Sequence, residues 1–201
     1  MKKKIIKLFF KIFLLCVLTG PLKASDNVKN TLSLGPDSAK VTVKVFSSLT
    51  CPHCATFHLE IFDKLKKDFI DKKLVKFEHH SFPLDLAALN AEIIVKCSLK
   101  KEDSFKLLKK MYENQNKWAV GKDIKKINSN IMNVAEKSNL KKAQMQKCLV
   151  NEKIQDNILN ERILAQKNYN ITSTPSIFIN EKKYNGKHIY KDFKKAIEKN
   201  L

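Results

Sequence analysis

The chain is poor in arginine, and it lacks internal repeats, low-complexity tracts and Gly/Ser-rich linkers. Of its 39 basic residues, only Arg162 is an arginine. Arginine is the residue best suited to bidentate contacts with phosphates and bases, and no block of lysines carries interleaved aromatic residues, so we expect no nucleic-acid partner. Because no linker or repeat divides the 201 residues, the length predicts one substantial core or one domain with an insertion.

Long apolar runs are also missing, since none reaches the ~20 residues that a membrane-spanning helix needs. The longest apolar stretch, Leu8 to Leu18, is interrupted by Lys11 and follows a lysine-rich start. A possible cleavage site, Leu22-Lys23-Ala24, ends on a small residue. Residues 1–24 therefore read as a secretory signal, which predicts export to the periplasm. A permanent anchor is the alternative, and Cys16 is expected to be removed with the signal.

The net charge is strongly positive, at +19 for the whole chain. Removing residues 1–24 takes away six lysines and no acidic residue, which leaves 33 basic against 20 acidic residues and a net charge of +13. We expect solvated helix faces to carry this excess, near anionic membrane surfaces.

An alternating pattern marks the first part of the mature chain. Val41, Val43 and Val45 alternate with more polar residues, which is the period-2 pattern of a strand. A helix is predicted to begin directly after it, because apolar residues then recur at four-residue spacing: Phe57, Ile61, Leu65 and Phe69. A second strand, from Leu74 to about Glu78, completes a β-α-β unit.

The remaining pattern is helical and then returns to strands. Apolar spacing predicts helices throughout 84–166. A strand over Ser176 to Ile179, a polar turn over 180–182, a short strand near Tyr184 and a helix over about 190–200 follow. The predicted fold is therefore α/β, in the order β-α-β, a helical block, β-β-α. Residues 25–83 and 167–201 would form one domain, with residues 84–166 inserted into it as an all-helical domain.

The tetrapeptide Cys51-Pro52-His53-Cys54 carries the chemistry, because two thiols separated by two residues can close a small, reversible disulfide. Cys51 would lie at the start of the predicted helix, where free backbone N–H groups and the helix dipole favour a thiolate. Cys54 would lie one turn further in, more buried and less acidic. Pro52 restrains the loop, and His53 is expected to tune the Cys51 thiolate.

Several motifs share a resemblance to one family. They are Leu34-Gly35-Pro36-Asp37, the run from Ser48 to His58 that holds the two cysteines, Phe82-Pro83-Leu84-Asp85, and Thr174-Pro175-Ser176 with Phe178-Ile179-Asn180. The chain resembles a thioredoxin-fold protein of the DsbA type, the periplasmic thiol oxidants of bacteria. The resemblance covers nearly the whole mature chain and implies a thioredoxin domain with a helical insertion.

The resemblance also implies an enzymatic activity. A thiol:disulfide oxidoreductase of this type gives its Cys51–Cys54 disulfide to unfolded or reduced secreted proteins, through a mixed disulfide on Cys51. A membrane reoxidase of the DsbB type would restore the disulfide, and no cofactor is expected. The bond before Pro175 is expected to be cis and to lie against the disulfide, where the backbone of Thr174 can pair with a bound peptide. We expect a monomer.

Cys97 and Cys148 both fall on predicted helices of the inserted block, where two lone thiols beside a thiol oxidant would be a liability. We predict a structural disulfide between them, which relatives resembling this chain often carry. The alternative is a second redox pair, although their spacing gives no short loop that would activate either thiol.

Other functions remain open. A metal site would use the histidines near the cysteines, but His79 and His80 would point to opposite faces of a strand. We therefore predict no metal site. The histidines are expected at the surface or its boundary: His58, His79, His80 and His188. Thr174 before the proline is shared with DsbC-type isomerases, which keeps isomerase or reductase activity open. A peptide-binding holdase without redox chemistry, using an apolar surface near Phe82, is the non-enzymatic alternative.

Overall fold

The computed structural model describes residues 31–98, 100–138 and 140–201. The predicted secretory signal, residues 1–24, lies outside them. The strands are β1 (Leu32–Leu34), β2 (Val41–Ser47), β3 (Val75–Ser81), β4 (Ser176–Ile179) and β5 (Lys182–Lys183). The helices are α2 (Pro52–Phe57), η1 (His58–Phe62), α3 (Asp63–Leu65), η2 (Lys66–Ile70), α4 (Leu86–Lys96), α5 (Lys101–Glu113), α6 (Gln115–Trp118), α7 (Ile124–Glu136), α8 (Lys142–Leu149), α9 (Glu152–Tyr169) and α10 (Tyr190–Glu198).

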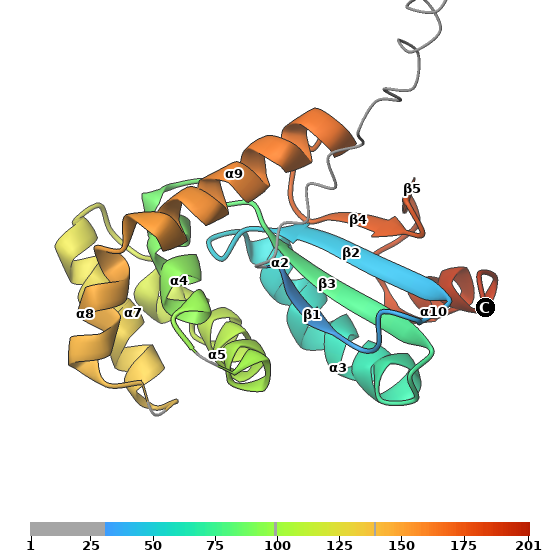
Figure 1. The fold of residues 1–201 in the computed structure, drawn as a ribbon, viewed down its shortest axis with the longest axis horizontal. Helices are drawn as coiled ribbons and strands as arrows, with labels where there is room; N and C mark the ends of the chain where they lie inside the picture. The colour runs from blue at the N-terminus through green and yellow to red at the C-terminus, as the bar shows by residue number, and fades with distance from the viewer. Residues whose placement is uncertain (1–30, 99, 139) are drawn as a thin grey trace, which may run out of the picture.

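In the described residues, a five-stranded sheet lies at the centre of the fold, in the order β1-β3-β2-β4-β5 (Figure 1). Strands β2 and β3 run parallel, while β1, β4 and β5 each pair antiparallel with their neighbours. The parallel pair needs a crossover, which the helix between them supplies. Its N-terminus at Pro52 follows the carboxyl end of β2 at Ser47 after the short loop 48–51.

The two faces of β2 differ as the alternating pattern predicted. Val41, Val43 and Val45 are buried and belong to the main hydrophobic core, together with the apolar stripe of the helix that follows. That helix is continuous from Pro52 to Ile70, with α-helical and π-helical segments in succession. Lys44 and Phe46 point to the opposite face, which is the one that α9 crosses.

Helices α4, α5, α7 and α8 lie together beside the sheet (Figure 1). Helix α9 returns from them across the face of the sheet opposite to the helix that runs from Pro52 to Ile70. A small apolar cluster holds α9 against the sheet: Phe46, Phe82, Ala165, Ile171 and Phe178. The guanidinium of Arg162 also donates to the Pro83 carbonyl oxygen at 2.6 Å. Helix α9 continues through Tyr169, and the division of the chain at residues 83 and 166 stays a prediction.

The secondary structure differs from the expectation in three places. Strand β1 was not predicted, because three residues are too few to show a period. Strand β3 extends through Ser81 rather than ending near Glu78, since it pairs along its whole length with β2. The last turn takes only Asn180 and Glu181, both at positive φ, so that β5 ends before Tyr184.

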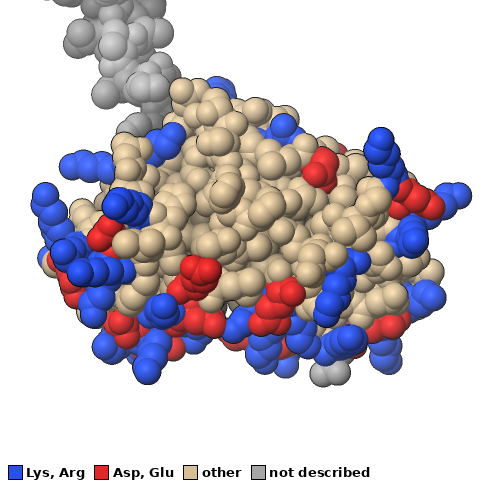
Figure 2. All heavy atoms as spheres, turned by 180° about the vertical axis from the view of Figure 1, so that it is seen from behind, with Lys and Arg blue, Asp and Glu red and all other residues tan. Residues whose placement is uncertain are grey.

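The surface charges are interleaved on the face drawn in Figure 2, where lysines and acidic residues alternate along the lower edge and a wide area above them carries few charges. None of the helices in the described ranges is long and apolar enough to cross a membrane.

Candidate redox site

Cys51 lies at the N-cap of α2, where the carboxyl end of β2 meets the helix. Its sulfur accepts a hydrogen bond from the Cys54 backbone N–H at 3.4 Å. Its carbonyl accepts from the N–H groups of Cys54 and Ala55, at 3.1 and 3.2 Å. Pro52 occupies the first helical position, where no N–H is needed. Both cysteines are free thiols and are buried, with 6% of Cys51 and 1% of Cys54 exposed.

The pKa values of the two thiols are shifted in opposite directions. A hydrogen bond from the Cys54 thiol, helped by the N–H groups of Cys54 and His53, outweighs desolvation and lowers the pKa of Cys51 from 9.0 to about 5. Burial, followed by the neighbouring Cys51 sulfur, raises the pKa of Cys54 well above its usual range. At neutral pH the reduced site therefore holds a thiolate on Cys51 and a protonated thiol on Cys54.

Thr174 and Pro175 come from the other end of the chain and face the cysteines. Their peptide bond is cis, as the family resemblance implied. The Cys51 sulfur lies 3.4 Å from the Thr174 carbonyl oxygen, to which it donates a hydrogen bond only in its protonated form, and the Thr174 hydroxyl is buried without a hydrogen-bond partner among the described residues. The structure thus brings Thr174 to Cys51 across 123 positions of sequence.

His53 is exposed on the first turn of α2. Among the described residues its imidazole makes no hydrogen bond to Cys51, and it is the backbone N–H of His53 that helps to lower the Cys51 pKa. The tuning role predicted for the His53 side chain stays a prediction.

Sequence reasoning missed the side chains that hold the loop before Cys51. The Thr50 hydroxyl donates to the Asp85 carboxylate at 2.8 Å, and Asp85 also caps α4 by accepting from the Ala88 N–H at 2.7 Å. Ser48 accepts from the Leu84 N–H at 3.3 Å. The resemblance already covered Leu84 and Asp85, but nothing local in the sequence assigned them a role at the site.

Two histidines expected at the surface are instead buried, so that prediction was wrong for them. His58 stacks on Phe62 with ring centroids 4.5 Å apart, and burial lowers the His58 pKa to about 3. His79 contacts the buried Glu92 carboxylate at 2.9 Å. Aromatic neighbours make the buried position of His58 tolerable, and the Glu92 carboxylate, 13 positions away, does so for His79. Within the described residues, no three His, Cys, Asp or Glu side chains are grouped as metal ligands.

Cys97 and Cys148 are joined by a disulfide bond that closes a separation of 51 positions. Cys148 lies on α8, whereas Cys97 is the C-cap residue of α4 rather than a residue within the helix. The bond therefore ties the end of α4 to α8 inside the helical block, and its purely structural role stays a prediction.

Replacing both residues together, Cys97→Ala with Cys148→Ala, is expected to lower the free energy of unfolding by about 4 kcal/mol, or less if the folded state is strained, because the denatured chain regains the entropy of an open loop. Urea denaturation measures the loss. Oxidation of a reduced peptide by the folded variant should match that of the parent, and lost turnover in a folded variant would instead assign this pair a redox role.

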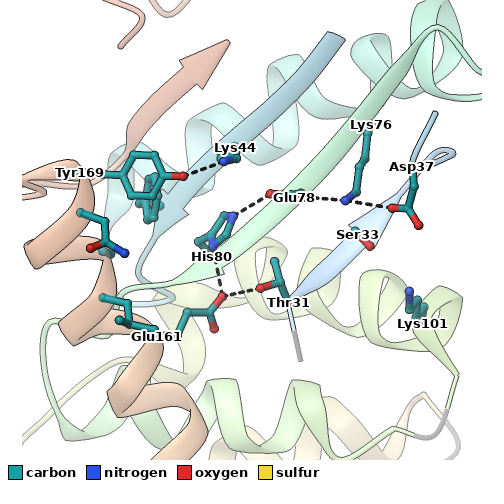
Figure 3. A pocket seen from close by; sticks show the side chains of 14 residues that line it. Thr31, Ser33, Asp37, Lys44, Lys76, Glu78, His80, Lys101, Glu161 and Tyr169 are labelled. Carbon is teal, nitrogen blue, oxygen red and sulfur yellow. Dashed lines mark hydrogen bonds and ion pairs between the residues drawn. The ribbon is translucent and has the colours of Figure 1, made fainter. Parts of the chain in front are cut away.

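Away from the cysteines, a polar cluster lies on the face of the sheet that α9 crosses, in a pocket of about 480 Å³ between the strands and α9 (Figure 3). Its centre is Glu161, which contacts Lys96 at 2.7 Å and His80 at 3.3 Å. His80 also contacts Glu78 at 3.0 Å. Burial disfavours both the Glu161 carboxylate and the His80 imidazolium, but their contacts outweigh it: the pKa of Glu161 falls to about 2, and that of His80 rises.

Glu161→Gln is expected to lower the free energy of unfolding by about 3–5 kcal/mol at neutral pH, because it leaves buried positive charge without its carboxylate. The depressed pKa of Glu161 fixes the sign: this stabilisation is present above about pH 4.5 and is lost as the pH falls toward 2. Denaturant unfolding against pH measures it. The exposed Glu136→Gln is the matched control, with an expected change within about 0.5 kcal/mol, and equal losses in both variants would contradict the role of the cluster.

Comparisons with known proteins agree with this site. The model of the thioredoxin family matches residues 27–199. Disulfide bond formation protein D of Bacillus subtilis is 33% identical over 193 residues, which cover 90% of this chain and 81% of that protein. The crystal structure of α-DsbA1 from Wolbachia pipientis has a TM-score of 0.76 at 31% identity, covering 85% of this chain and 90% of that chain. Oxidised BdbD from Bacillus subtilis has a TM-score of 0.74 at 27% identity, with coverage of 86% and 94%.

These similarities confirm two expectations from the sequence. The fold is a thioredoxin-like α/β fold with a helical insertion, and the CxxC pair belongs to a disulfide oxidoreductase. The chain therefore belongs to the thioredoxin family, as a thiol:disulfide oxidoreductase of the DsbA type.

Proposed function

We propose that this oxidoreductase works as a dithiol oxidase, which passes its Cys51–Cys54 disulfide to reduced secreted proteins. The observation that carries the proposal is the contrast between the two thiols: the pKa of Cys51 is lowered to about 5, while that of the buried Cys54 is raised. Stabilising the thiolate stabilises the reduced form, which makes the disulfide easier to reduce. DsbA is the established example of this relation.

The reaction would begin when a substrate thiolate attacks the Cys51 sulfur and breaks the Cys51–Cys54 bond. Cys54 leaves and takes up a proton, as its raised pKa favours. A second substrate thiolate then attacks the substrate sulfur of the mixed disulfide and releases Cys51 as a thiolate. The substrate loses two electrons and gains a disulfide, while the protein gains a dithiol.

In this second step Cys51 is a good leaving group, because a thiol of low pKa leaves faster. The backbone of Thr174, next to Cys51, would pair with the bound substrate peptide. We further propose that Pro52 restrains the active-site loop and that Thr174 and Pro175 form the peptide-binding element.

Export is the second part of the proposal. The basic start and the short apolar stretch in residues 1–24 support secretion to the periplasm, where oxidising conditions allow disulfides to persist. The electrons that Cys51 and Cys54 receive would pass to a membrane reoxidase of the DsbB type.

Isomerase activity is a second candidate, because Thr174 precedes the cis proline as in DsbC-type isomerases. The two activities separate in one experiment, in which the oxidised protein is given a reduced two-cysteine peptide and the reduced protein is given a substrate with mispaired disulfides. An oxidase consumes the first stoichiometrically and rearranges the second slowly. Rapid rearrangement by the reduced protein would favour the isomerase, and unchanged client protection by a Cys51→Ser, Cys54→Ser variant would favour a holdase.

A further inference from the structure

Gln115, the first residue of α6, reaches from the helical block to the loop that carries Cys51. Its side-chain amide donates to the Leu49 carbonyl oxygen at 2.7 Å and to the Cys51 carbonyl oxygen at 3.1 Å. The half-buried amide thus bridges two backbone groups that lie more than sixty positions earlier in the sequence. The Leu49 residue itself is fully buried, so its carbonyl needs a donor within the protein.

The backbone on either side of Gln115 is anchored in the helical block. Three residues after Gln115, Trp118 is fully buried, and its indole N–H donates to the Met111 carbonyl oxygen at 2.8 Å. The Asn114 side chain donates to the Lys110 carbonyl oxygen at 2.9 Å, which closes the junction between α5 and α6. Gln115 therefore extends from an anchored turn of the helical block.

The Cys51 carbonyl that Gln115 contacts also closes the first turn of α2. It accepts from the Cys54 and Ala55 N–H groups, and the same Cys54 N–H contacts the Cys51 sulfur. A shift of the Cys51 backbone would therefore move the sulfur away from the N–H groups that stabilise its thiolate. Thr50 is held from the other side by Asp85, so contacts from the helical block hold the loop on two sides.

We propose that Gln115 is a positioning residue of the redox centre: through the Leu49 and Cys51 carbonyls it holds Cys51 at the helix N-terminus in the geometry that favours the thiolate. The helical block then sets the oxidising power of the CxxC pair, in addition to covering it. This inference rests on the proposed function only in taking Cys51 as the reactive thiol.

Gln115→Met tests the proposal, because methionine keeps the length of the side chain and removes both N–H donors. Gln144→Met is the matched control: Gln144 makes the same kind of bond, from its amide to the Cys97 carbonyl oxygen at 3.3 Å, beside the other disulfide. Each variant is equilibrated with glutathione, where two glutathione thiols become one glutathione disulfide as the Cys51–Cys54 bond accepts two electrons. The pKa of Cys51 is measured from the ultraviolet absorbance of the thiolate.

Losing hydrogen bonds of this kind is expected to shift the redox equilibrium about five- to tenfold toward the oxidised protein in Gln115→Met, and tenfold corresponds to about 30 mV. The Cys51 pKa should rise in the same variant. Gln144→Met should stay within about twofold of the parent, since its bond does not reach the active site. Gln115→Glu should shift the equilibrium further in the same direction, because a carboxylate cannot donate and repels the Cys51 thiolate.

Gln115→Glu keeps a polar side chain of similar size and provides the test if the methionine variant does not fold. An unchanged equilibrium and an unchanged Cys51 pKa in a folded Gln115 variant would overturn the proposal, even if that variant were less stable, because Gln115 would then support only the fold. The absolute reduction potential of the parent tests the proposed oxidase activity. The ratio of the variant's equilibrium constant to the parent's tests the positioning role of Gln115, so either proposal can fail without the other.

Discussion

Replacing Cys51 by serine is expected to lower the rate at which the protein oxidises a reduced two-cysteine peptide by roughly 10³-fold or more, as expected for loss of the reacting group itself. The hydroxyl cannot form a disulfide, so neither the oxidised enzyme nor the mixed disulfide can exist. Stopped-flow fluorescence of the peptide follows the rate.

Cys54→Ser is the complementary variant. It keeps the Cys51 thiolate and removes the thiol that could resolve a mixed disulfide, so a covalent complex with a disulfide-containing peptide should accumulate and be visible by mass spectrometry. The Cys97→Ala, Cys148→Ala variant is the control for loss of any disulfide, and it should keep its turnover. Turnover by Cys51→Ser, or a substrate attached to Cys54 in the parent, would contradict the assignment of Cys51 as the attacked sulfur.

The stability of the reduced protein is expected to depend on pH in a way that the oxidised protein does not. The folded state lowers the pKa of Cys51 from 9.0 to about 5. A depressed pKa contributes stability that is fully present above the unfolded pKa and is lost as the pH falls through the folded one. Between about pH 9 and pH 5 the reduced form should therefore lose up to about 1.4 kcal/mol per pH unit relative to the oxidised form, or less where solvent screens the thiolate.

Denaturant unfolding of both redox forms across this range measures the difference. Cys54 does not alter the sign, because its raised pKa keeps it protonated in the folded state throughout the window. The reduced Cys51→Ser variant should lose the extra slope. The same pH slope in both redox forms of the parent would contradict a stabilised Cys51 thiolate.

Local patterns were enough to predict the elements whose partners lie nearby. The alternation of Val41, Val43 and Val45 and the stripe that begins at Phe57 each record burial along a single strand or helix, so both elements were predicted close to their observed places. Strand β1 was missed because its existence depends on pairing with β3, where Leu32 lies opposite His79. No pattern within three residues can record such a partner.

The redox site likewise combines residues that local sequence patterns predict with residues whose contacts are distant in the sequence. The CxxC spacing and the strand before it place Cys51 at a helix start, and the distant Thr174-Pro175 was found only through its resemblance to a family. Gln115 and Asp85 were missed because their contacts with the loop span 64 and 35 positions. His79 was placed wrongly because Glu92, the buried carboxylate that it contacts, lies on another element.

The redox equilibrium of Cys51–Cys54 with glutathione tests the central claim most directly, because it measures the direction in which electrons flow through the pair. A dithiol oxidase with a stabilised Cys51 thiolate should have a reduction potential less negative than about −180 mV, the value of protein disulfide isomerase. A potential near that of thioredoxin, about −270 mV, would contradict the account and make this protein a reductant.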